Sequence, residues 1–327
     1  MDEEPSLPTV SIVIAAWNAE ATILRAVRSV LDQEYPNRQV VVVDDGSTDR
    51  TAEVVAQLES PDVLLLRQEN KGAATARNRG WRSSAGDYIH FLDADDVLLP
   101  GSIRHEVERA LRSKTHPCYT YGGYTVMDEN GRVFKHSDIP EAEGNLLDLF
   151  IRTESLFLPT ICLLEREILD QTGGFDEELR YHEDRVFFLK VAKSFPAVAV
   201  PGVVAHYTQS VHGKARRSVA NYTEALDNQF RMLSHCEPFL NPEEFDTVRT
   251  VTFNSLCARF LLYGHSKNAH RLCRDVEFTV HKNSPKGALT WLSLCLRINL
   301  LYPARRVFIF LQTSFAHNWM KTTKQRR

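Results

Sequence analysis

Short apolar, β-branched runs alternate with segments of helical periodicity over the first hundred residues. The runs Val10–Ala15, Gln39–Val43, Val63–Arg67 and Tyr88–Leu92 are typical of strands buried on both faces of a sheet. Between them, Ile23, Val27, Val30 and Leu31 recur at the spacing typical of a helix with one buried face. Further helices are predicted up to Leu58 and over Ala73–Arg82. This alternation predicts a parallel sheet with helices on both faces.

Beyond Pro100 the pattern is mixed, and from about Val219 it is helical only. The mixed region predicts strands over Tyr119–Met127 and Ala197–His206 and helices over Leu146–Ile151 and Asp184–Ser194. Later helices are expected over Val219–His235, Pro242–Tyr263, Lys267–Val280, Gly287–Leu301 and Ala304–Phe315. We therefore expect an α/β domain over residues 1–215, in halves 1–100 and 101–215, followed by an all-α region over 216–327.

The composition changes this picture little. Hydrophobic residues make up 43% of the chain, and a net charge of −3 predicts no general attraction to nucleic acid. The six cysteines show neither CxxC nor Cys/His metal spacing, and the chain shows no secretory signal. We expect reduced thiols and a cytoplasmic protein.

The end of the sequence differs in charge from the rest. After Glu277 there are nine Lys and Arg residues and no Asp or Glu, with Trp291, Phe308, Phe310 and Trp319 among them. Such a basic, aromatic segment is typical of helices that lie on anionic membrane surfaces. It predicts peripheral contact with the inner face of the plasma membrane, and a helical end packed on its own domain is the alternative. The sequence contains no run of about 18 or more apolar residues, so it predicts no membrane span.

Polar residues follow each of the first four predicted strands, where ligands bind in open α/β sheets. The sharpest group is Asp93-Ala94-Asp95-Asp96, in which three carboxylates repel one another unless a cation lies among them. Carboxylate oxygens favour Mg²⁺ or Mn²⁺, which also bind phosphate oxygens of a substrate. The alternative is that Asp95 or Asp96 only caps the helix that begins near Pro100.

Four segments, in this order and spacing, resemble the nucleotide-binding half of the family 2 glycosyltransferases, which have the GT-A fold. They are VSIVIAAWNAE, VVVDDGSTD, NKGAATARNRG and FLDADD. The resemblance covers residues 8–100 strongly and extends more weakly to about residue 213. It implies an inverting transferase with a nucleotide-sugar-binding half, residues 1–100, and an acceptor half, residues 101–215.

The resemblance also implies roles for residues of the donor site. Ala15, Ala16 and Trp17 would line the nucleoside pocket, with Trp17 stacked on the base where the family usually has Tyr, and Glu20 near the ribose. Asp45 would accept the N3–H of uracil or thymine, which favours UDP- or dTDP-sugars. Arg77 would lie beside the diphosphate or base, with a solvated helix face as the alternative. The DxD motif consists of Asp93, Ala94 and Asp95. In it, Asp93 would contact the ribose or the sugar, and Asp95 would bind the metal.

An acceptor hydroxyl must also lose a proton during transfer. The resemblance implies that Asp184, supported by Glu183, is the base, and the alternative is two ordinary acids in the first turn of a helix. Gly173-Gly174-Phe175-Asp176 matches a segment that the family places under the acceptor site. His212 would help to hold the metal, although it is displaced from the family's YRxHxxS pattern and that pattern's Arg is missing.

The sequence therefore predicts a glycosyltransferase acting on a glycan, lipid-linked or other hydroxyl acceptor, in cell-surface polysaccharide or glycolipid synthesis. Two alternatives come from other classes. A sugar nucleotidyltransferase would carry a Gly-rich basic loop after the first strand, where Trp17-Asn18-Ala19-Glu20 stands instead. An inactive nucleotide-sugar-binding protein would have lost the DxD or the Glu183-Asp184 pair. A dinucleotide-binding dehydrogenase is excluded because no GxGxxG follows the first strand.

Overall fold

The computed structural model describes residues 7–128, 131–137, 139, 141–153, 158–209, 221–262 and 265–275. The chain divides into two compact units, residues 1–150 with 155–211 and residues 151–154 with 212–327. The predicted helices Gly287–Leu301 and Ala304–Phe315 lie outside the described residues. The same is true of the predicted domain boundary near residue 215.

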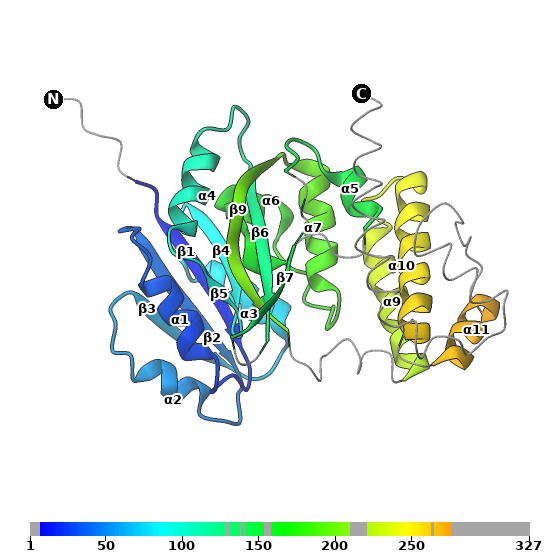
Figure 1. Ribbon diagram of the computed structural model, residues 1–327, viewed down its shortest axis with the longest axis horizontal. Helices are drawn as coiled ribbons and strands as arrows, with labels where there is room; N and C mark the ends of the chain where they lie inside the picture. The colour runs from blue at the N-terminus through cyan, green and yellow to red at the C-terminus, as the bar shows by residue number, and fades with distance from the viewer. Residues whose placement is uncertain are drawn as a thin grey trace. The chain divides into compact units, whose positions relative to one another are not determined.

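The first four strands and the three helices between them occur where the sequence pattern predicts them (Figure 1). They are β1 (Val10–Ala16), α1 (Ile23–Leu31), β2 (Arg38–Asp45), α2 (Thr51–Ala56), β3 (Val63–Gln68), α3 (Ala73–Arg82) and β4 (Tyr88–Asp93). The run Val40–Val43 is fully buried, as expected for a strand covered on both faces. Helices α1 and α2 contact each other, whereas α3 packs on β1 and β2 in the connection that returns from β3 to β4. Right-handed crossovers put α3 on the opposite face of the sheet from α1 and α2.

The second half of this unit adds elements of varied length. They are β5 (Val97–Leu98), α4 (Ser102–Leu111), β6 (Tyr119–Met127), β7 (Val133–His136), α5 (Leu147–Ile151), η1 (Pro159–Ile161), β8 (Cys162–Glu165), α6 (Arg166–Thr172), α7 (Glu183–Ser194) and β9 (Ala197–Thr208). The sequence pattern predicted β6, β9, α5 and α7, but it missed β5, β7, β8 and α6. Strands of two to four residues are too short to show a period.

The sheet contains both parallel and antiparallel strands. Its order is β3-β2-β1-β4-β8-β6-β9-β5, with β7 paired to β6. Strands β1 to β4 are parallel, as predicted, and so are β6 and β9. Strand β8 lies between β4 and β6 and is antiparallel to both. This unpredicted strand joins the two halves of the unit into one sheet.

A glycine lets α3 approach the sheet closely. A Cβ atom on Gly80 would lie 2.3 Å from Cγ1 of Val13 on β1 and 3.3 Å from Cγ2 of Val43 on β2. No other residue fits at this position without movement of Val13. The glycine therefore fixes how near α3, which carries Arg77 and Asn78, lies to the two central strands.

The described part of the second unit consists of α9 (Tyr222–Cys236), α10 (Pro242–Leu262) and α11 (Ser266–Asp275). Asn221 caps α9 by accepting the backbone N–H groups of Thr223 and Glu224. Asn241 caps α10 in the same way, and Glu244 accepts the N–H of Asn241 in return. These helices match three of the predicted ones within a few residues. None of the described helices combines the length and apolar character needed to cross a bilayer.

Candidate active site

The carboxyl ends of β1, β2, β3 and β4 meet at one edge of the sheet, as the strand pattern predicted. Ala15 on β1 lies in register with Val43 on β2 and with Asp93 on β4. The residue after it, Ala16, pairs with Asp44. The predicted donor-site residues of three strands are thereby neighbours, although they are separated by up to about eighty positions in the sequence.

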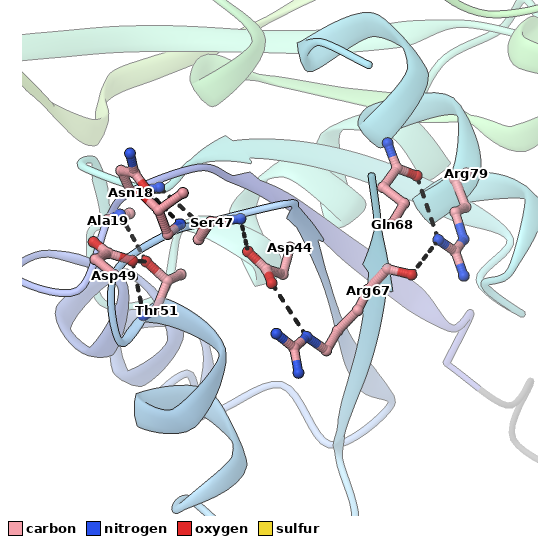
Figure 2. A network of polar contacts seen from close by, with 10 residues as sticks. Asn18, Ala19, Asp44, Ser47, Asp49, Thr51, Arg67, Gln68 and Arg79 are labelled. Atoms are coloured by element: carbon pink, nitrogen blue, oxygen red, sulfur yellow. Dashed lines mark hydrogen bonds and ion pairs between the residues drawn. The ribbon is translucent and has the colours of Figure 1, made fainter. Parts of the chain in front are cut away.

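The loop after β1 is tied to the turn after β2 by several hydrogen bonds (Figure 2). The backbone N–H of Asn18 donates to Oγ of Ser47 at 3.0 Å, and Oδ1 of Asn18 accepts the N–H of Thr48 at 2.8 Å. The N–H of Ala19 donates to Oγ1 of Thr51 at 2.8 Å. The loop that carries Trp17 is therefore held in place before any ligand binds.

The side chains of this loop differ in exposure. Trp17 is 58% exposed, which leaves its ring available for stacking. Ala15 is partly exposed, whereas Ala16 is buried, so a ligand contact by Ala16 would use its backbone. Glu20 accepts the N–H of Arg50 through Oε2 at 3.0 Å. The loop thus offers one large aromatic surface and one anchored carboxylate.

Asp45 is buried at the end of β2 and faces the segment that opens α3. Its Oδ1 accepts the N–H of Lys71 at 2.9 Å and an N–H of the Gln68 amide at 2.8 Å, and Oδ2 accepts the N–H of Gly72 at 2.8 Å. A carboxylate accepts about four hydrogen bonds, so one position remains on Oδ2. Asp44, the neighbouring acid, accepts hydrogen bonds from the N–H of Ser47 and from Nε of Arg67 (Figure 2).

Asp96 anchors the acidic loop after β4 to two other segments of the chain. Its side chain is fully buried and accepts Oγ1–H of Thr160 at 2.6 Å and the N–H of Thr208 at 2.8 Å. Burial, with the negative charges of Asp93 and Asp95, raises the pKa of Asp96 well above its ordinary value. Asp96 does not cap α4, whose N-cap is Gly101. The third acid of the motif is therefore a support for the first two.

Asp95 lies on the same loop, one residue after Ala94. Its backbone carbonyl accepts a hydrogen bond from Nη2 of Arg25 at 2.9 Å, and the same nitrogen contacts Oγ1 of Thr208. The side chain of Asp95 is partly exposed, whereas Ala94 is buried. Arg25 and Thr208 therefore fix the backbone from which Asp95 projects.

Arg77 joins the DxD motif to the Glu183-Asp184 pair. Its Nη2 donates to Oδ1 of Asp93 at 2.8 Å, and its Nη1 donates to Oε1 of Glu183 at 2.9 Å. The guanidinium also lies over the ring of Phe175, 5.2 Å from its centre. This arginine is buried, which excludes the solvated helix face considered from the sequence.

The two acids that open α7 differ in their surroundings. Glu183 is nearly buried, and burial together with the charge of Asp184 raises its pKa, against the opposing effect of Arg77. Asp184 is partly exposed, and its Oδ1 accepts the N–H of Arg185 at 2.7 Å. His182, the N-cap, has a left-handed backbone with φ of 65°. Glu183 is thus hydrogen-bonded to Arg77, whereas Asp184 acts on Arg77 through its charge and is partly exposed.

The Gly-Gly-Phe-Asp segment packs on α3. Asn78 accepts the N–H of Phe175 at 2.9 Å and donates to the carbonyl of Phe175 at 2.7 Å. A Cβ on Gly174 would lie 2.4 Å from Oδ1 of Asn78. The absence of a side chain at Gly174 therefore lets the amide of Asn78 approach this segment closely. Phe175 then stacks on Phe187, with ring centres 4.3 Å apart, and forms the platform beneath Arg77.

Several residues of this site were not identified from the sequence. Arg25, Thr160 and Thr208 position the acidic loop, and Asn78 positions Phe175. Only Asn78 carried a signal, as part of the ARN triplet, because the other three depend on long-range contacts that no local pattern reports. His212, expected to help hold the metal, lies outside the described residues.

Comparisons with known proteins show which family this chain resembles. The family model described as glycosyl transferase family 2 matches residues 11–173. The chain is 30% identical to an uncharacterized glycosyltransferase of Haemophilus influenzae, over 58% of this chain and 73% of that protein. It is 34% identical to the putative teichuronic acid biosynthesis glycosyltransferase TuaG of Bacillus subtilis, over 61% of this chain and 79% of TuaG. It is also 34% identical to the succinoglycan biosynthesis protein ExoO of Rhizobium meliloti, over 55% of this chain and only 54% of ExoO.

Solved structures confirm the predicted GT-A-type fold. TarS residues 1–349 of S. aureus superpose with a TM-score of 0.57 at 16% identity, over 86% of this chain and 87% of that one. The mannosyltransferase PcManGT of Pyrobaculum calidifontis, solved with GDP-Man and Mn²⁺, gives a TM-score of 0.58 at 19% identity, over 99% of this chain and 89% of that one. The sequence relatives and the matching family model show that this chain is a glycosyltransferase and belongs to glycosyl transferase family 2.

Proposed function

We propose that the chain transfers a sugar, with inversion, from a nucleotide-sugar to a hydroxyl group during polysaccharide biosynthesis. One observation carries the proposal: Arg77 bonds Asp93 of the DxD motif and Glu183 of the Glu-Asp pair at 2.8 and 2.9 Å. The two motifs assigned to donor and acceptor are therefore one site. Neither a sugar nucleotidyltransferase nor an inactive binding protein would need this second acidic pair.

A pyrimidine nucleotide fits the donor half. Asp45 keeps one acceptor position on Oδ2 for the N3–H of uracil or thymine, and exposed Trp17 offers a ring for stacking. TarS has been solved with UDP-GlcNAc and with UDP, which supports UDP, whereas PcManGT was solved with GDP-Man. A guanine donor is thus the direct competitor in any test.

The acidic loop suits a divalent ion of the Mg²⁺ or Mn²⁺ type. Asp96 is engaged by Thr160 and Thr208, and Asp93 is engaged by Arg77. Asp95 is the second acid of the DxD motif and is partly exposed on a fixed backbone, and it is the residue that would hold the ion, with His212 as the second candidate. When bound, the ion would neutralise charge on the leaving diphosphate. The hard oxygen donors match this class of metal.

Asp184 is the base in this proposal. The acceptor oxygen attacks the anomeric carbon, the bond from that carbon to the diphosphate oxygen breaks, and the hydroxyl proton moves to Asp184. Glu183, paired with Arg77, holds the first turn of α7 in position and is not available as the proton acceptor. Arg77 places its positive charge beside Asp93, near the expected diphosphate.

The acceptor is proposed from the sequence relatives. ExoO and TuaG are named for the synthesis of succinoglycan and teichuronic acid, so a growing or lipid-linked glycan is the acceptor class we expect. The basic tail after Glu277, which lies outside the described residues, would bring the enzyme to a membrane surface that carries such an acceptor.

A donor screen tests the proposal. The purified chain is incubated with UDP-, dTDP- and GDP-sugars and Mn²⁺, and release of sugar to water is measured for each. We expect turnover of a UDP- or dTDP-sugar, lost with a chelator and lost in Asp95→Asn. The matched control is Asp62→Asn, an exposed acid that precedes β3, which should keep full activity. Preference for GDP-sugars would overturn the pyrimidine assignment, and chelator-resistant turnover would overturn the metal.

A further inference from the structure

Three potential metal ligands meet at the edge of the sheet opposite the acidic loop. Glu165 ends β8 and lies in register with Tyr88, the first residue of β4. Cys118 directly precedes β6, and His116 lies two residues earlier. Because Asp93 is at the other end of β4, this group is separated from the candidate active site by the length of that strand.

The three ligand atoms lie close together. Nδ1 of His116 is 2.6 Å from Oε1 of Glu165, and Sγ of Cys118 is 3.2 Å from the same oxygen. The separation of Sγ and Nδ1 is 4.0 Å. The thiol is buried, Glu165 is nearly buried, and the ring of His116 is half exposed. An ion would therefore enter from the side of His116.

Both ring nitrogens of His116 face hydrogen-bond acceptors. Nε2 lies 3.1 Å from the backbone carbonyl of Ser113, and Nδ1 faces the Glu165 carboxylate. A neutral imidazole has only one N–H, so it satisfies one acceptor and leaves its lone pair against the other. The pair needs a cation between Nδ1 and Oε1, which is either a second proton on the ring or a metal ion.

We propose that His116, Cys118 and Glu165 bind one divalent metal ion of the zinc class. Nitrogen, sulfur and oxygen from one residue each suit Zn²⁺ or Co²⁺, with water at the open position, and do not suit Mg²⁺. Tetrahedral Zn²⁺ needs ligand atoms roughly 3.3–3.8 Å apart, so Nδ1 and Oε1 separate by less than about 1 Å on binding.

The surroundings supply the outer contacts that such sites need. The carbonyl of Ser113 orients the ring of His116, and the N–H of Cys118 donates to Oε1 of Glu165 at 3.0 Å. The ion would fasten the turn before β6 to the end of β8. This site is distinct from the Asp95 site in position and in ligand type.

Binding has a defined proton balance. Burial raises the pKa of the Cys118 thiol to about 12, so the apo protein holds the thiol proton. The metal replaces that thiol proton, which leaves with each ion bound, and the imidazole binds through the lone pair of Nδ1 with its proton on Nε2. Affinity therefore rises steeply with pH.

Metal titration of the chelator-stripped full chain tests the site. We expect one equivalent of Zn²⁺ to bind and to raise the melting temperature, and Co²⁺ to give a thiolate charge-transfer absorption. Both signals should disappear in His116→Gln, whose altered side chain is half exposed, and in Cys118→Ser. The matched control Cys236→Ser changes a buried cysteine of the second unit and should keep both.

Two results would overturn the proposal: no stoichiometric Zn²⁺ binding by the wild-type chain, or a Co²⁺ signal that persists in His116→Gln. Either result would show that this group is only a hydrogen-bonded contact between His116 and Glu165. If Cys118→Ser fails to fold, the wild-type titration and His116→Gln still decide the question.

Discussion

Arg77 and Glu183 are 106 positions apart in the sequence and form an ion pair of 2.9 Å. The pair links α3, in the donor half, to the first turn of α7, in the acceptor half. Because the other branch of the guanidinium bonds Asp93, a change at Arg77 should affect both halves at once.

Replacing Arg77 should destabilise the protein in a pH-dependent way. Arg77→Gln leaves the nearly buried Glu183 without its cation, which should cost about 3–5 kcal/mol at neutral pH. The pKa of Glu183 is raised already, and loss of Arg77 raises it further. The folded variant then binds more protons than the unfolded chain between the unfolded pKa, about 4.3, and the raised value. Its stability should therefore fall as pH rises through that window.

Urea unfolding of Arg77→Gln and wild type at about pH 5 and pH 7 measures this difference. The deficit of the variant should be smaller at the lower pH. Arg77→Lys, which keeps the charge but not the two-branched geometry, should recover part of the stability. An equal deficit of Arg77→Gln at both pH values would contradict the buried ion pair.

The two acids of α7 should separate in their effects. Asp184→Asn should bind the donor as wild type does and lose transfer by about 10²–10⁴-fold, the usual contribution of a general base. Glu183→Gln keeps an oxygen for Arg77 and should lose less. Donor binding by calorimetry and transfer by product release are the two measurements. If Asp184→Asn transfers at the wild-type rate, the base is another residue.

Gly80→Ala should destabilise the protein although alanine is the better helix former. The added Cβ would meet Cγ1 of Val13 at 2.3 Å, and such overpacking typically costs about 1–3 kcal/mol. Val13→Ala removes the obstructing methyl groups, so the double variant should be more stable than the sum of the two single changes predicts. Denaturant unfolding of the four proteins closes this cycle, and simple additivity would show that α3 moves away instead.

His206 should make the protein less stable in mild acid. Burial and the charge of Arg25 lower the pKa of His206 below its ordinary value of 6.5. The unfolded chain therefore binds this proton more readily, and stability is lost as pH falls below about 6.5. In His206→Gln this part of the loss should be absent. Melting temperatures at about pH 7 and pH 5 report it, and identical slopes for variant and wild type would exclude the effect.

The donor half of the fold could be predicted almost to the residue, because its strands are buried on both faces and its helices have one apolar side. The helix Ala73–Arg82 and the strand Tyr119–Met127 were predicted with the observed bounds. Strand β8 was missed because its four residues, Cys162–Glu165 in the structure, contain only three apolar positions in a row, which fit a helix or a strand equally well.

Site residues could be predicted only where a motif marks them. The acids of FLDADD and the Arg of the ARN triplet were marked in this way. The pairing of Arg77 with Glu183 and of Asp96 with Thr208 was not predicted, since these hydrogen bonds depend on how distant segments pack. The motifs accordingly predicted separate roles for Asp93 and Asp95, but not the supporting role of Asp96.

The support for the acidic loop also has a consequence during synthesis. Asp96 is held by Thr160, 64 residues later, and by Thr208, 112 residues later. A nascent chain that has emerged only as far as β6 contains the whole acidic sequence but neither of these partners. Three neighbouring acids without their supports repel one another. The ribosome therefore produces a donor site that stays incomplete until β9 has left the exit tunnel.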